Sequence, residues 1–262
     1  MKRLLITGKN GYIARQFEAF IRQFPEEYGV TSVSLRGDDW REMDLSPYDV
    51  ILHTAGIVHI RETPENAHLY YEVNRDLTIE LAGKAKNAGV KQFVFLSTVS
   101  VYGMDEGVIT EETVPNPVTH YGKSKLQAEE GILPLQSEDF TVSILRPPMV
   151  YGDGCKGNYQ ALVKIARVSP VFPDYQNRRS MVSIETLCRF VKDVMDRQVA
   201  GIFFPQELEY VCTSRMVQEI AAKEGRKINL VRWLNPAVSL AVRFTRKGRK
   251  AFGNLVYRGS SA

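Results

Sequence analysis

A tyrosine and a lysine stand four residues apart in the segment Tyr121-Gly-Lys-Ser-Lys125. On a helix, this spacing places Tyr121 and Lys125 on one face. A phenol with its ordinary pKa of about 10 is a poor base at neutral pH. An ammonium group held beside it favours the phenolate and lowers that pKa. The pair therefore predicts acid–base chemistry at Tyr121, tuned by Lys125.

A strand that ends in hydroxyl groups precedes this pair. The run Phe95-Leu96-Ser97-Thr98 is apolar until its last two residues. Ligands of parallel sheets bind at the carboxyl edge, where such a strand ends. Tyr-x-x-x-Lys alone arises by chance in many helices, but together with this strand and the glycine turn described next it strongly indicates a catalytic site.

The turn from Thr7 to Ala14 lies between the first expected strand and the first expected helix. A dinucleotide site needs a tight turn, a residue without a side chain near the pyrophosphate, and a small residue where helix meets strand. Gly8, Gly11 and Ala14 fit these roles, and a helix N-terminus attracts phosphate. The alternative is a purely structural turn. The predicted cofactor contacts here are Gly8, Asn10, Gly11, Tyr12 and Ile13.

The end of the second expected strand bears on the choice of cofactor. A carboxylate there binds the ribose 2′-hydroxyl of NAD, whereas an arginine accommodates the 2′-phosphate of NADP. Arg36 follows this strand directly, and Asp38 and Asp39 come later. We expect NADP(H), because guanidinium pairs well with phosphate. NAD stays possible, and the alternative for Arg36 is a surface residue.

Short apolar runs alternate with helical periodicity over the first two-thirds of the chain. Strands are expected at residues 4–7, 30–35, 49–53, 91–97, 141–145 and 202–204, and helices at 13–24, 65–88, 121–135, 182–197, 214–223 and 236–246. Such βαβ alternation predicts an α/β fold of the Rossmann type, a doubly wound parallel sheet with helices on both faces. We expect a cofactor domain of residues 1–148 plus about 178–205, and a smaller discontinuous substrate lobe of about 149–177 plus 206–262.

The composition of the chain bears on its cellular compartment, on metal binding and on its charged partners. The chain has 262 residues and a net charge of +4, with no apolar run near the ~20 residues of a membrane span. Its three cysteines lack zinc or disulfide spacing, so we expect a cytoplasmic protein without a metal. After Glu224 there is no acidic residue but nine basic ones. This basic tail suggests contact with phosphates or an anionic surface, or else a solvated face.

These motifs together resemble the extended short-chain dehydrogenase/reductases, in the branch that acts on nucleotide-linked sugars. The matching residues beyond those above are Asp44, Leu45, His53-Thr54-Ala55-Gly56, Asn74, Val101-Tyr102-Gly103 and Arg146-Pro147. The resemblance implies that Asp44 and Leu45 meet the adenine and that Ala55, Gly56 and Asn74 belong to the cofactor site. It also implies a catalytic set of Thr98, Tyr121 and Lys125. Thr98, three residues before Val101, takes the place of the family's catalytic Ser/Thr. Tyr121 exchanges a proton with the sugar oxygen, and Lys125 holds the ribose and tunes Tyr121.

The resemblance extends to the substrate side. Asn158 and Arg179 match residues that contact a nucleotide diphosphate, which suits a forked donor. The alternatives are that Asn158 turns a loop and that Arg179 lies on the surface. His59 could line the sugar pocket, although a histidine in an apolar loop is more often simply packed. We expect Thr98 to contact the substrate as well.

Three functions are consistent with these residues. The first is reduction of an NDP-4-keto-6-deoxy sugar by NADPH, with Tyr121 as proton donor, and Arg36 favours it. The second is a 4-epimerase with tightly bound NAD, and the third is a non-catalytic NADP sensor. We do not expect the enzyme to catalyse dehydration. Dehydratases of this branch carry an Asp-Glu pair directly after the catalytic threonine, and this chain has Val99 and Ser100 there.

The resemblance also predicts a homodimer through the helices of residues 65–88 and 121–135. We expect no nucleic-acid partner. The C-terminal segment could touch a membrane weakly through an apolar helix face of Leu234, Ala237, Val238, Ala241 and Phe244 with a basic end. The competing interpretation, which we favour, is that this face closes the substrate lobe.

Overall fold

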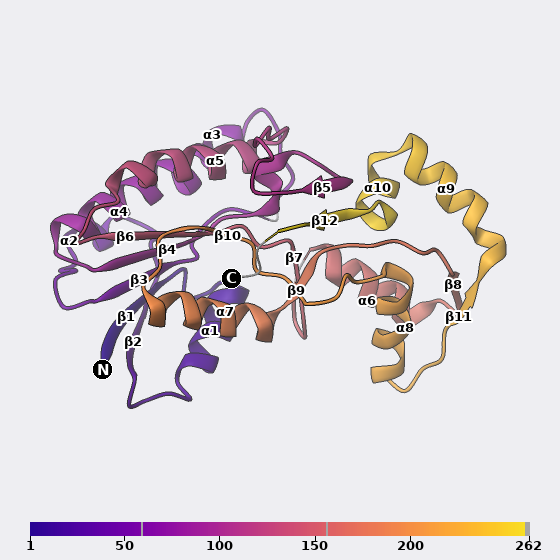
Figure 1. Cartoon of the computed structure of the whole chain (residues 1–262), viewed down its shortest axis with the longest axis horizontal. Helices are drawn as coiled ribbons and strands as arrows, with labels where there is room; N and C mark the ends of the chain where they lie inside the picture. The colour runs from indigo at the N-terminus through magenta and orange to yellow at the C-terminus, as the bar shows by residue number, and fades with distance from the viewer. Residues whose placement is uncertain (59, 156, 260–262) are drawn as a thin grey trace.

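A six-stranded parallel sheet forms the larger half of the computed structural model, which describes residues 1–58, 60–155 and 157–259. Its strands lie in the order β10-β6-β4-β3-β1-β2 (Figure 1). Their bounds are β1 Lys2–Thr7, β2 Tyr28–Val33, β3 Val50–His53, β4 Gln92–Leu96, β6 Thr141–Leu145 and β10 Gly201–Phe203. The predicted doubly wound α/β fold is confirmed.

Helices cover both faces of this sheet. α1 (Tyr12–Ile21) and α7 (Ile184–Arg197) lie on one face, and α4 (Leu77–Asn87) and α5 (His120–Ile132) lie on the other (Figure 1). Alternate residues of each strand feed the two layers, since Leu4 packs with α1 and α7 whereas Leu5 packs with α4 and α5. The buried central strands are almost wholly apolar, as expected for a sheet covered on both faces.

The helix expected over residues 65–88 is interrupted. It begins as α3 (Ala67–Tyr71), widens into the π-helical turn η1 (Glu72–Asp76) and continues as α4. Such π-turns occur frequently at functional sites, and this one carries Asn74. The helix expected over 121–135 also differs, because it ends at Ile132 and a 3-10 turn, η3 (Leu133–Leu135), follows with Pro134 near its start.

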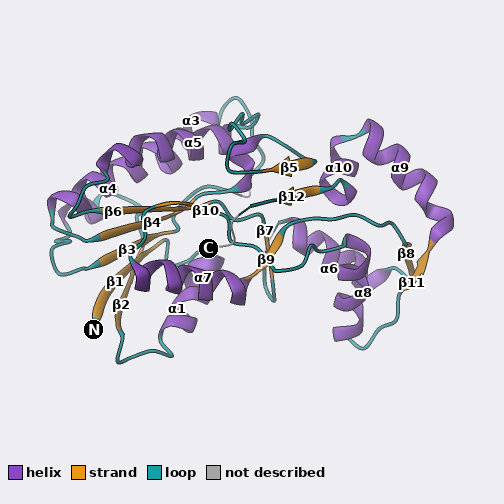
Figure 2. Cartoon of the chain, in the orientation of Figure 1, coloured by secondary structure: helices purple, strands orange, loops and turns teal. Residues whose placement is uncertain are grey.

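A second lobe has its own apolar core, formed by α6 (Asn158–Val168) and α8 (Thr213–Lys223) with the strand pair β8 (Val171–Pro173) and β11 (Asn229–Val231). The short 3-10 turn η4 (Arg232–Leu234), α9 (Asn235–Phe244) and α10 (Arg246–Phe252) follow along its outer edge (Figure 2). The paired strands β7 (Met149–Tyr151) and β9 (Met181–Ser183) link this lobe to the sheet.

The end of the chain returns toward the larger half. β12 (Leu255–Tyr257) pairs in parallel with β5 (Gly107–Ile109), which follows the 3-10 turn η2 (Val99–Tyr102). Tyr257 is buried against Tyr102 and Val101. The segment from residue 206 that we assigned to the substrate lobe therefore contributes its last described strand to the neighbourhood of the catalytic half.

Candidate active site

The glycine turn brings two loops of the sheet edge into close approach. Gly8 has a φ of +84°, and a Cβ there would lie 2.9 Å from the backbone N and Cα of Ala55. A side chain is therefore excluded on two counts, by conformation and by space. The N–H of Gly11 donates to the carbonyl of Gly8 at 2.7 Å, and α1 begins at the next residue. Such a turn at a helix N-terminus offers backbone N–H groups to phosphates.

The first two side chains of α1, those of Tyr12 and Ile13, point away from the glycine turn. Ile13 packs against the core under α1. The Tyr12 hydroxyl is buried and forms no hydrogen bond with any described residue, and a Cβ on Gly152 would lie 3.1 Å from it. Burial also raises the pKa of Tyr12. Tyr12 thus connects the predicted cofactor turn to the loop after β7, whereas Asn10 is exposed on the turn itself.

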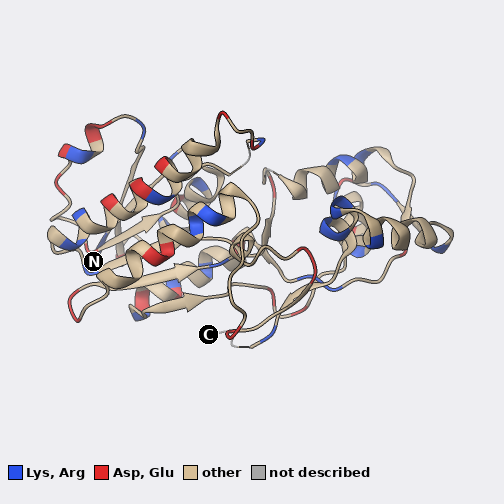
Figure 3. Ribbon diagram, turned by 90° about the horizontal axis from the view of Figure 1, so that it is seen from above, with Lys and Arg blue, Asp and Glu red and all other residues tan. Residues whose placement is uncertain are grey.

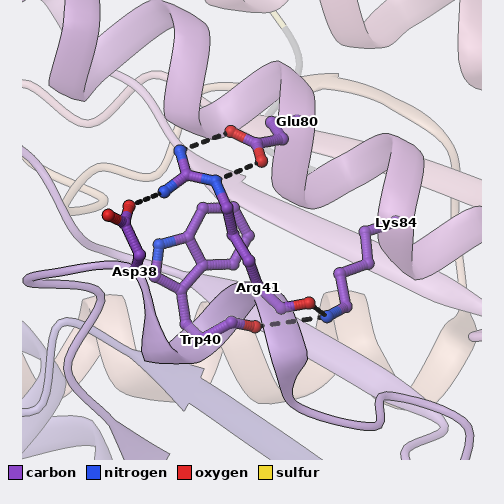
Figure 4. A network of polar contacts seen from close by, with 5 residues as sticks. All are labelled: Asp38, Trp40, Arg41, Glu80 and Lys84. Atoms are coloured by element: carbon purple, nitrogen blue, oxygen red, sulfur yellow. Dashed lines mark hydrogen bonds and ion pairs between the residues drawn. The ribbon is translucent and has the colours of Figure 1, made fainter.

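The segment after β2 is fastened to α4 by a polar network (Figure 4). Arg41, in the short helix α2 (Asp39–Glu42), binds Glu80 through two hydrogen bonds of 2.5 and 2.7 Å and also pairs with Asp38. Lys84 donates to the carbonyls of Trp40 and Arg41. Arg41 therefore engages the Asp38 carboxylate, while Arg36 is exposed at the end of β2.

Asp44 and Leu45 follow this network. The Asp44 carboxylate accepts hydrogen bonds of 2.9 Å from the backbone N–H and the hydroxyl of Ser46, which lower its pKa. Leu45 is buried in the core beside α4. Their predicted contact with adenine stays a prediction.

Asn74 holds the loop that follows β3. Its side-chain amide accepts a hydrogen bond from Ile57 N at 2.7 Å and donates to Ile57 O at 3.0 Å. It also donates to the Ser124 hydroxyl of α5 at 3.2 Å. A Cβ on Gly56 would lie 2.9 Å from Asn74 Oδ1 and 4.0 Å from Lys125 Nζ. The π-turn, the Ala55-Gly56 loop and the catalytic helix therefore meet at one point.

His53 is buried beneath this loop. Its Nδ1 lies 2.7 Å from the Thr7 hydroxyl and its Nε2 lies 3.0 Å from the Thr78 hydroxyl. Thr78 uses its own proton for the carbonyl of Asn74, at 2.8 Å, so His53 donates from Nε2 and accepts at Nδ1. Burial, reinforced by Lys125, lowers the pKa of His53 to about 3. A neutral histidine thus ties β1 and β3 to the π-turn.

Two of the three predicted catalytic side chains, Thr98 and Tyr121, meet at the carboxyl edge of the sheet, and Lys125 lies beside β4. The Tyr121 side chain forms a hydrogen bond with Thr98. Thr98 also caps η2, accepting from Ser100 N at 3.1 Å. The Lys125 ammonium is buried and lies 4.0 Å from the centre of the Phe95 ring. The spacing expected from the sequence is thus realised on α5.

The expected lowering of the Tyr121 pKa is wrong for the protein alone. Burial raises the pKa of Tyr121 to about 12, with only the Thr98 hydrogen bond acting against it. Burial lowers the pKa of Lys125 to about 7, although Glu129 opposes that change. Removal from water disfavours the charged form of each group. At neutral pH Tyr121 is therefore protonated and suited to donate a proton.

A buried ion pair lies one helical turn behind Lys125, and the sequence interpretation missed it. Glu129 receives hydrogen bonds from Arg146 Nε at 3.1 Å and Nη2 at 2.5 Å, and a further one from the Ser97 hydroxyl. Arg146 also donates to the Tyr102 hydroxyl at 2.7 Å. The Tyr257 hydroxyl donates to the carbonyl of Arg146 at 2.8 Å. This network joins α5, η2 and β12 to the residues that directly follow β4 and β6.

A second missed residue is Glu62, which precedes α3. Its carboxylate accepts from the backbone N–H groups of His120 at 3.2 Å and Tyr121 at 3.0 Å. A carboxylate at a helix N-terminus is stabilised by the free N–H groups and the helix dipole. Thr119 caps the same helix end through Gly122 N at 3.0 Å. No motif pointed to Glu62, because its partner lies 59 residues further along the chain.

The predicted substrate-side residues are spread more widely. Asn158 is exposed as the first residue of α6. Arg179 is half-buried, and its guanidinium donates to the carbonyl of Gly253 at 2.7 Å and of Arg249 at 3.2 Å, at the C-terminal end of α10. Burial lowers the pKa of Arg179, and the charge of Asp105 acts against that change. His59 lies outside the described residues. Within residues 1–58, 60–155 and 157–259, no group of three or more His, Cys, Asp or Glu side chains could hold a metal ion.

Comparisons with known proteins agree with this geometry. The model of the NAD dependent epimerase/dehydratase family matches residues 4–200. UDP-glucose 4-epimerase of Vibrio cholerae is 34% identical over 249 residues, which is 84% of this chain and 75% of that protein. GDP-6-deoxy-D-mannose reductase of Pseudomonas aeruginosa is 26% identical over 74% of this chain and 67% of its own. The crystal structure of dTDP-4-dehydrorhamnose reductase from Bacillus anthracis with NADP has a TM-score of 0.75 at 17% identity, covering 99% of this chain and 91% of that one.

A parallel sheet with a glycine turn on its first strand and a Thr-Tyr-Lys set at its carboxyl edge defines a class, the dinucleotide-dependent oxidoreductases of the extended short-chain type. The chain belongs to the NAD dependent epimerase/dehydratase family. It is accordingly an NAD(P)-dependent enzyme of nucleotide-sugar metabolism. No helix in the described ranges is both long and apolar enough to pass through a bilayer.

Proposed function

We propose that this enzyme reduces the keto group of a nucleotide-linked 4-keto-6-deoxy sugar with NADPH. The observation that carries the proposal is Arg36, which is exposed where β2 ends, while the nearby Asp38 carboxylate is paired with Arg41. A guanidinium at this position favours a 2′-phosphate over a 2′-hydroxyl. Reductases commonly use exchangeable NADPH, and the P. aeruginosa relative is named as a reductase.

The catalytic groups suit this direction of reaction. When bound, NADPH supplies the hydride that adds to the carbonyl carbon. Tyr121, held protonated by burial, gives its proton to the carbonyl oxygen, and the Thr98 hydroxyl orients that oxygen. Lys125 holds the cofactor ribose and limits the charge that builds up on the Tyr121 oxygen. General acid catalysis of this kind contributes roughly 10²–10⁴-fold.

The predicted contacts complete the proposal. The glycine turn and Asn74 loop hold the cofactor in the domain of residues 1–148 and about 178–205. Asn158 and Arg179 bind the substrate diphosphate, and His59 lines the sugar pocket. Asp44 and Leu45 meet the adenine. For Arg179, the two carbonyls of α10 fix the guanidinium, which favours a preorganised anion contact. We place the enzyme in the cytoplasm, where both NADPH and nucleotide sugars are found.

A 4-epimerase with tightly bound NAD is the second candidate, because the V. cholerae relative is named as one and is 34% identical. Thr98, Tyr121 and Lys125 serve both reactions. The experiment that separates them is to purify the enzyme, release its bound nucleotide and identify it by mass. Stoichiometric NAD would support the epimerase, whereas an empty site that fills with NADPH would support the reductase. The presence of all three catalytic side chains argues against a non-catalytic sensor.

We also propose that the enzyme forms a homodimer. α4 and α5 lie side by side on one face of the sheet, where Arg75 of η1 donates to Gln127 of α5 at 3.0 Å (Figure 1). Two copies of this pair could form a four-helix bundle about a twofold axis. Light scattering at micromolar concentration tests this, and a monomer mass would contradict it.

A further inference from the structure

A stripe of large apolar side chains on the 3-10 turn η4 and on α9 faces solvent. Trp233, Leu240 and Phe244 are 72%, 61% and 67% exposed. On α9, Ala237, Leu240 and Phe244 stand three and four residues apart, so they lie on one side of the helix, and Trp233 directly precedes the helix in η4. Single exposed apolar residues need no explanation, but several large ones gathered on one short segment indicate an interaction surface.

This stripe is not the apolar face expected from the sequence. Of that predicted face, Val238 is buried and Leu234 and Ala241 are half-buried, because α10 packs closely on α9 where Gly248 meets the Ala241 carbonyl. Phe244 and Ala237 belong to the exposed side instead. The helix therefore has one face toward the protein and a second apolar face that no described residue covers.

Basic side chains surround the exposed stripe. Arg243 stacks on the Phe244 ring with 5.4 Å between guanidinium carbon and ring centre, and Lys247 and Lys250 follow on α10. These three cations are exposed and form no ion pair with any described residue. From residue 225 onward the sequence holds no Asp or Glu. Figure 3 shows the resulting concentration of Lys and Arg on α9 and α10, away from the acidic side chains of the larger half.

The stripe is presented rigidly at the outer edge of the lobe (Figure 1). Arg232 pairs with Asp174 at 3.1 Å, and Asn235 donates to the Asp174 carbonyl at 2.9 Å, so the start of α9 is anchored. At its other end, Thr245 caps α10 through Gly248 N at 2.9 Å. The backbone at both ends of α9 is therefore held by these contacts, with the apolar face outward.

We propose that the α9–α10 surface, defined by Trp233, Leu240, Phe244, Arg243, Lys247 and Lys250, docks on the anionic surface of a phospholipid bilayer. An interfacial helix buries aromatic and aliphatic side chains at the headgroup level while arginine and lysine meet lipid phosphates. Trp and Phe are typical of that depth. The charge selects anionic lipid, because each cation near such a surface strengthens binding by about fivefold. The inference is independent of which reaction the enzyme catalyses.

Trp233 makes the test direct. The chain has two tryptophans, and Trp40 is buried whereas Trp233 is exposed. Vesicles of equal parts phosphatidylglycerol and phosphatidylcholine, at low salt, should shift the Trp233 emission to the blue and should sediment the protein. Vesicles of phosphatidylcholine alone should do neither. Lipids brominated in the acyl chain should quench the shifted emission, which a contact with headgroups alone would not produce.

Three variants assign the binding to this surface. Arg243→Gln/Lys247→Gln/Lys250→Gln should lower the partition coefficient roughly a hundredfold. Leu240→Ser/Phe244→Ser should lower it roughly tenfold or more for each side chain. Lys91→Gln/Lys164→Gln/Lys223→Gln changes the net charge equally at exposed sites elsewhere and should bind as the parent does. Unchanged circular dichroism and cofactor binding would show that each variant is folded.

Several outcomes would overturn the proposal. The parent protein could stay in the supernatant with anionic vesicles at low salt. The control triple variant could lose as much binding as the α9–α10 triple variant, which would mean that net charge alone acts. Leu240→Ser/Phe244→Ser could instead convert a dimer to a monomer in a protein that ignores vesicles, which would assign the stripe to a second copy of the chain.

Discussion

The catalytic half and the α9–α10 surface treat charge in opposite ways. Beside α5, one pair of opposite charges is buried: Glu129 and Arg146 are each less than a tenth exposed and bind each other. On α9 and α10, Arg243, Lys247 and Lys250 face solvent with no acidic partner among the described residues. Burying and pairing a charge fixes the geometry around it, whereas exposing it leaves it free for an outside partner.

This difference teaches how one chain divides its tasks. Catalysis needs Thr98 and Tyr121 held in one arrangement before the substrate arrives, and a saturated buried network supplies that. Surface attachment needs only a sign of charge and an apolar area, which an exposed helix supplies. Substitutions in the first region should therefore change turnover or folding steeply, and those in the second should change neither.

Tyr121→Phe gives the largest effect expected on the catalytic side. It removes the proton donor but keeps the ring, so turnover should fall roughly 10²–10⁴-fold. Cofactor affinity should stay near that of the parent, as titration with NADPH would measure. Tyr48→Phe, outside the site, serves as the matched control. Turnover of Tyr121→Phe close to that of the parent would remove Tyr121 from the mechanism.

Arg146→Met should lower the free energy of unfolding by about 3–5 kcal/mol, because Glu129 is left as an unpaired buried charge. Denaturant titration measures the change. Replacing both partners, as Glu129→Leu/Arg146→Met, should recover much of that loss. Arg167→Met breaks the exposed pair with Glu224 and should leave stability nearly unchanged. A small effect of Arg146→Met would abolish the contrast between the two regions.

Sequence reasoning found the fold and the residues whose spacing is local. Tyr121 and Lys125 share a helix, and Gly8 and Gly11 share a turn, so periodicity alone places them. The buried network joins residues of α5 and β12 to those that follow β4 and β6, and only the folded chain shows that pairing. A signal did exist, since Glu129 stands four residues after Lys125 and Arg146 directly follows an apolar strand. No signal in the sequence indicated the π-turn at Asn74, because the spacing of apolar residues in a π-turn differs too little from that in an α-helix.

The apolar face of α9 shows the same limit. Apolar residues recur at helical spacing on two different faces of α9. The sequence pattern therefore could not show which of the two faces packs against the protein. Packing of α10 through Gly248 decides it. The pKa of Tyr121 likewise depends on burial, which the motif does not contain.

Arg36→Ala should have a smaller effect, confined to one cofactor. If Arg36 binds the 2′-phosphate, its loss weakens NADPH binding by ~1.5–3 kcal/mol, the range for a hydrogen bond to a charged group. NADH binding should change little. Arg15→Ala, exposed on α1, is the control. Dissociation constants for both cofactors measure the effect, and equal losses for the two would show that Arg36 does not choose between them.

His53 should give the smallest effect, seen as acid sensitivity of the catalytic half. Its pKa is about 3 in the folded protein and about 6.5 in an unfolded chain. As the pH falls below about 6.5, the unfolded state takes up a proton that the folded state refuses, so stability is lost between about pH 6.5 and 3. The contribution of His53 to the free energy of unfolding changes by at most about 1.4 kcal/mol for each pH unit.

Comparing variants isolates this contribution from that of the carboxylates. His53→Asn keeps a donor and an acceptor for Thr78 and Thr7 but does not titrate, so its stability should fall less steeply between pH 7 and pH 5, by roughly 2 kcal/mol. His68→Gln, at an exposed position, should follow the parent. Denaturant midpoints across that range measure the slopes. Parallel curves for the parent and His53→Asn would mean that His53 is protonated inside the fold, and the neutral link from β3 to the π-turn would then be wrong.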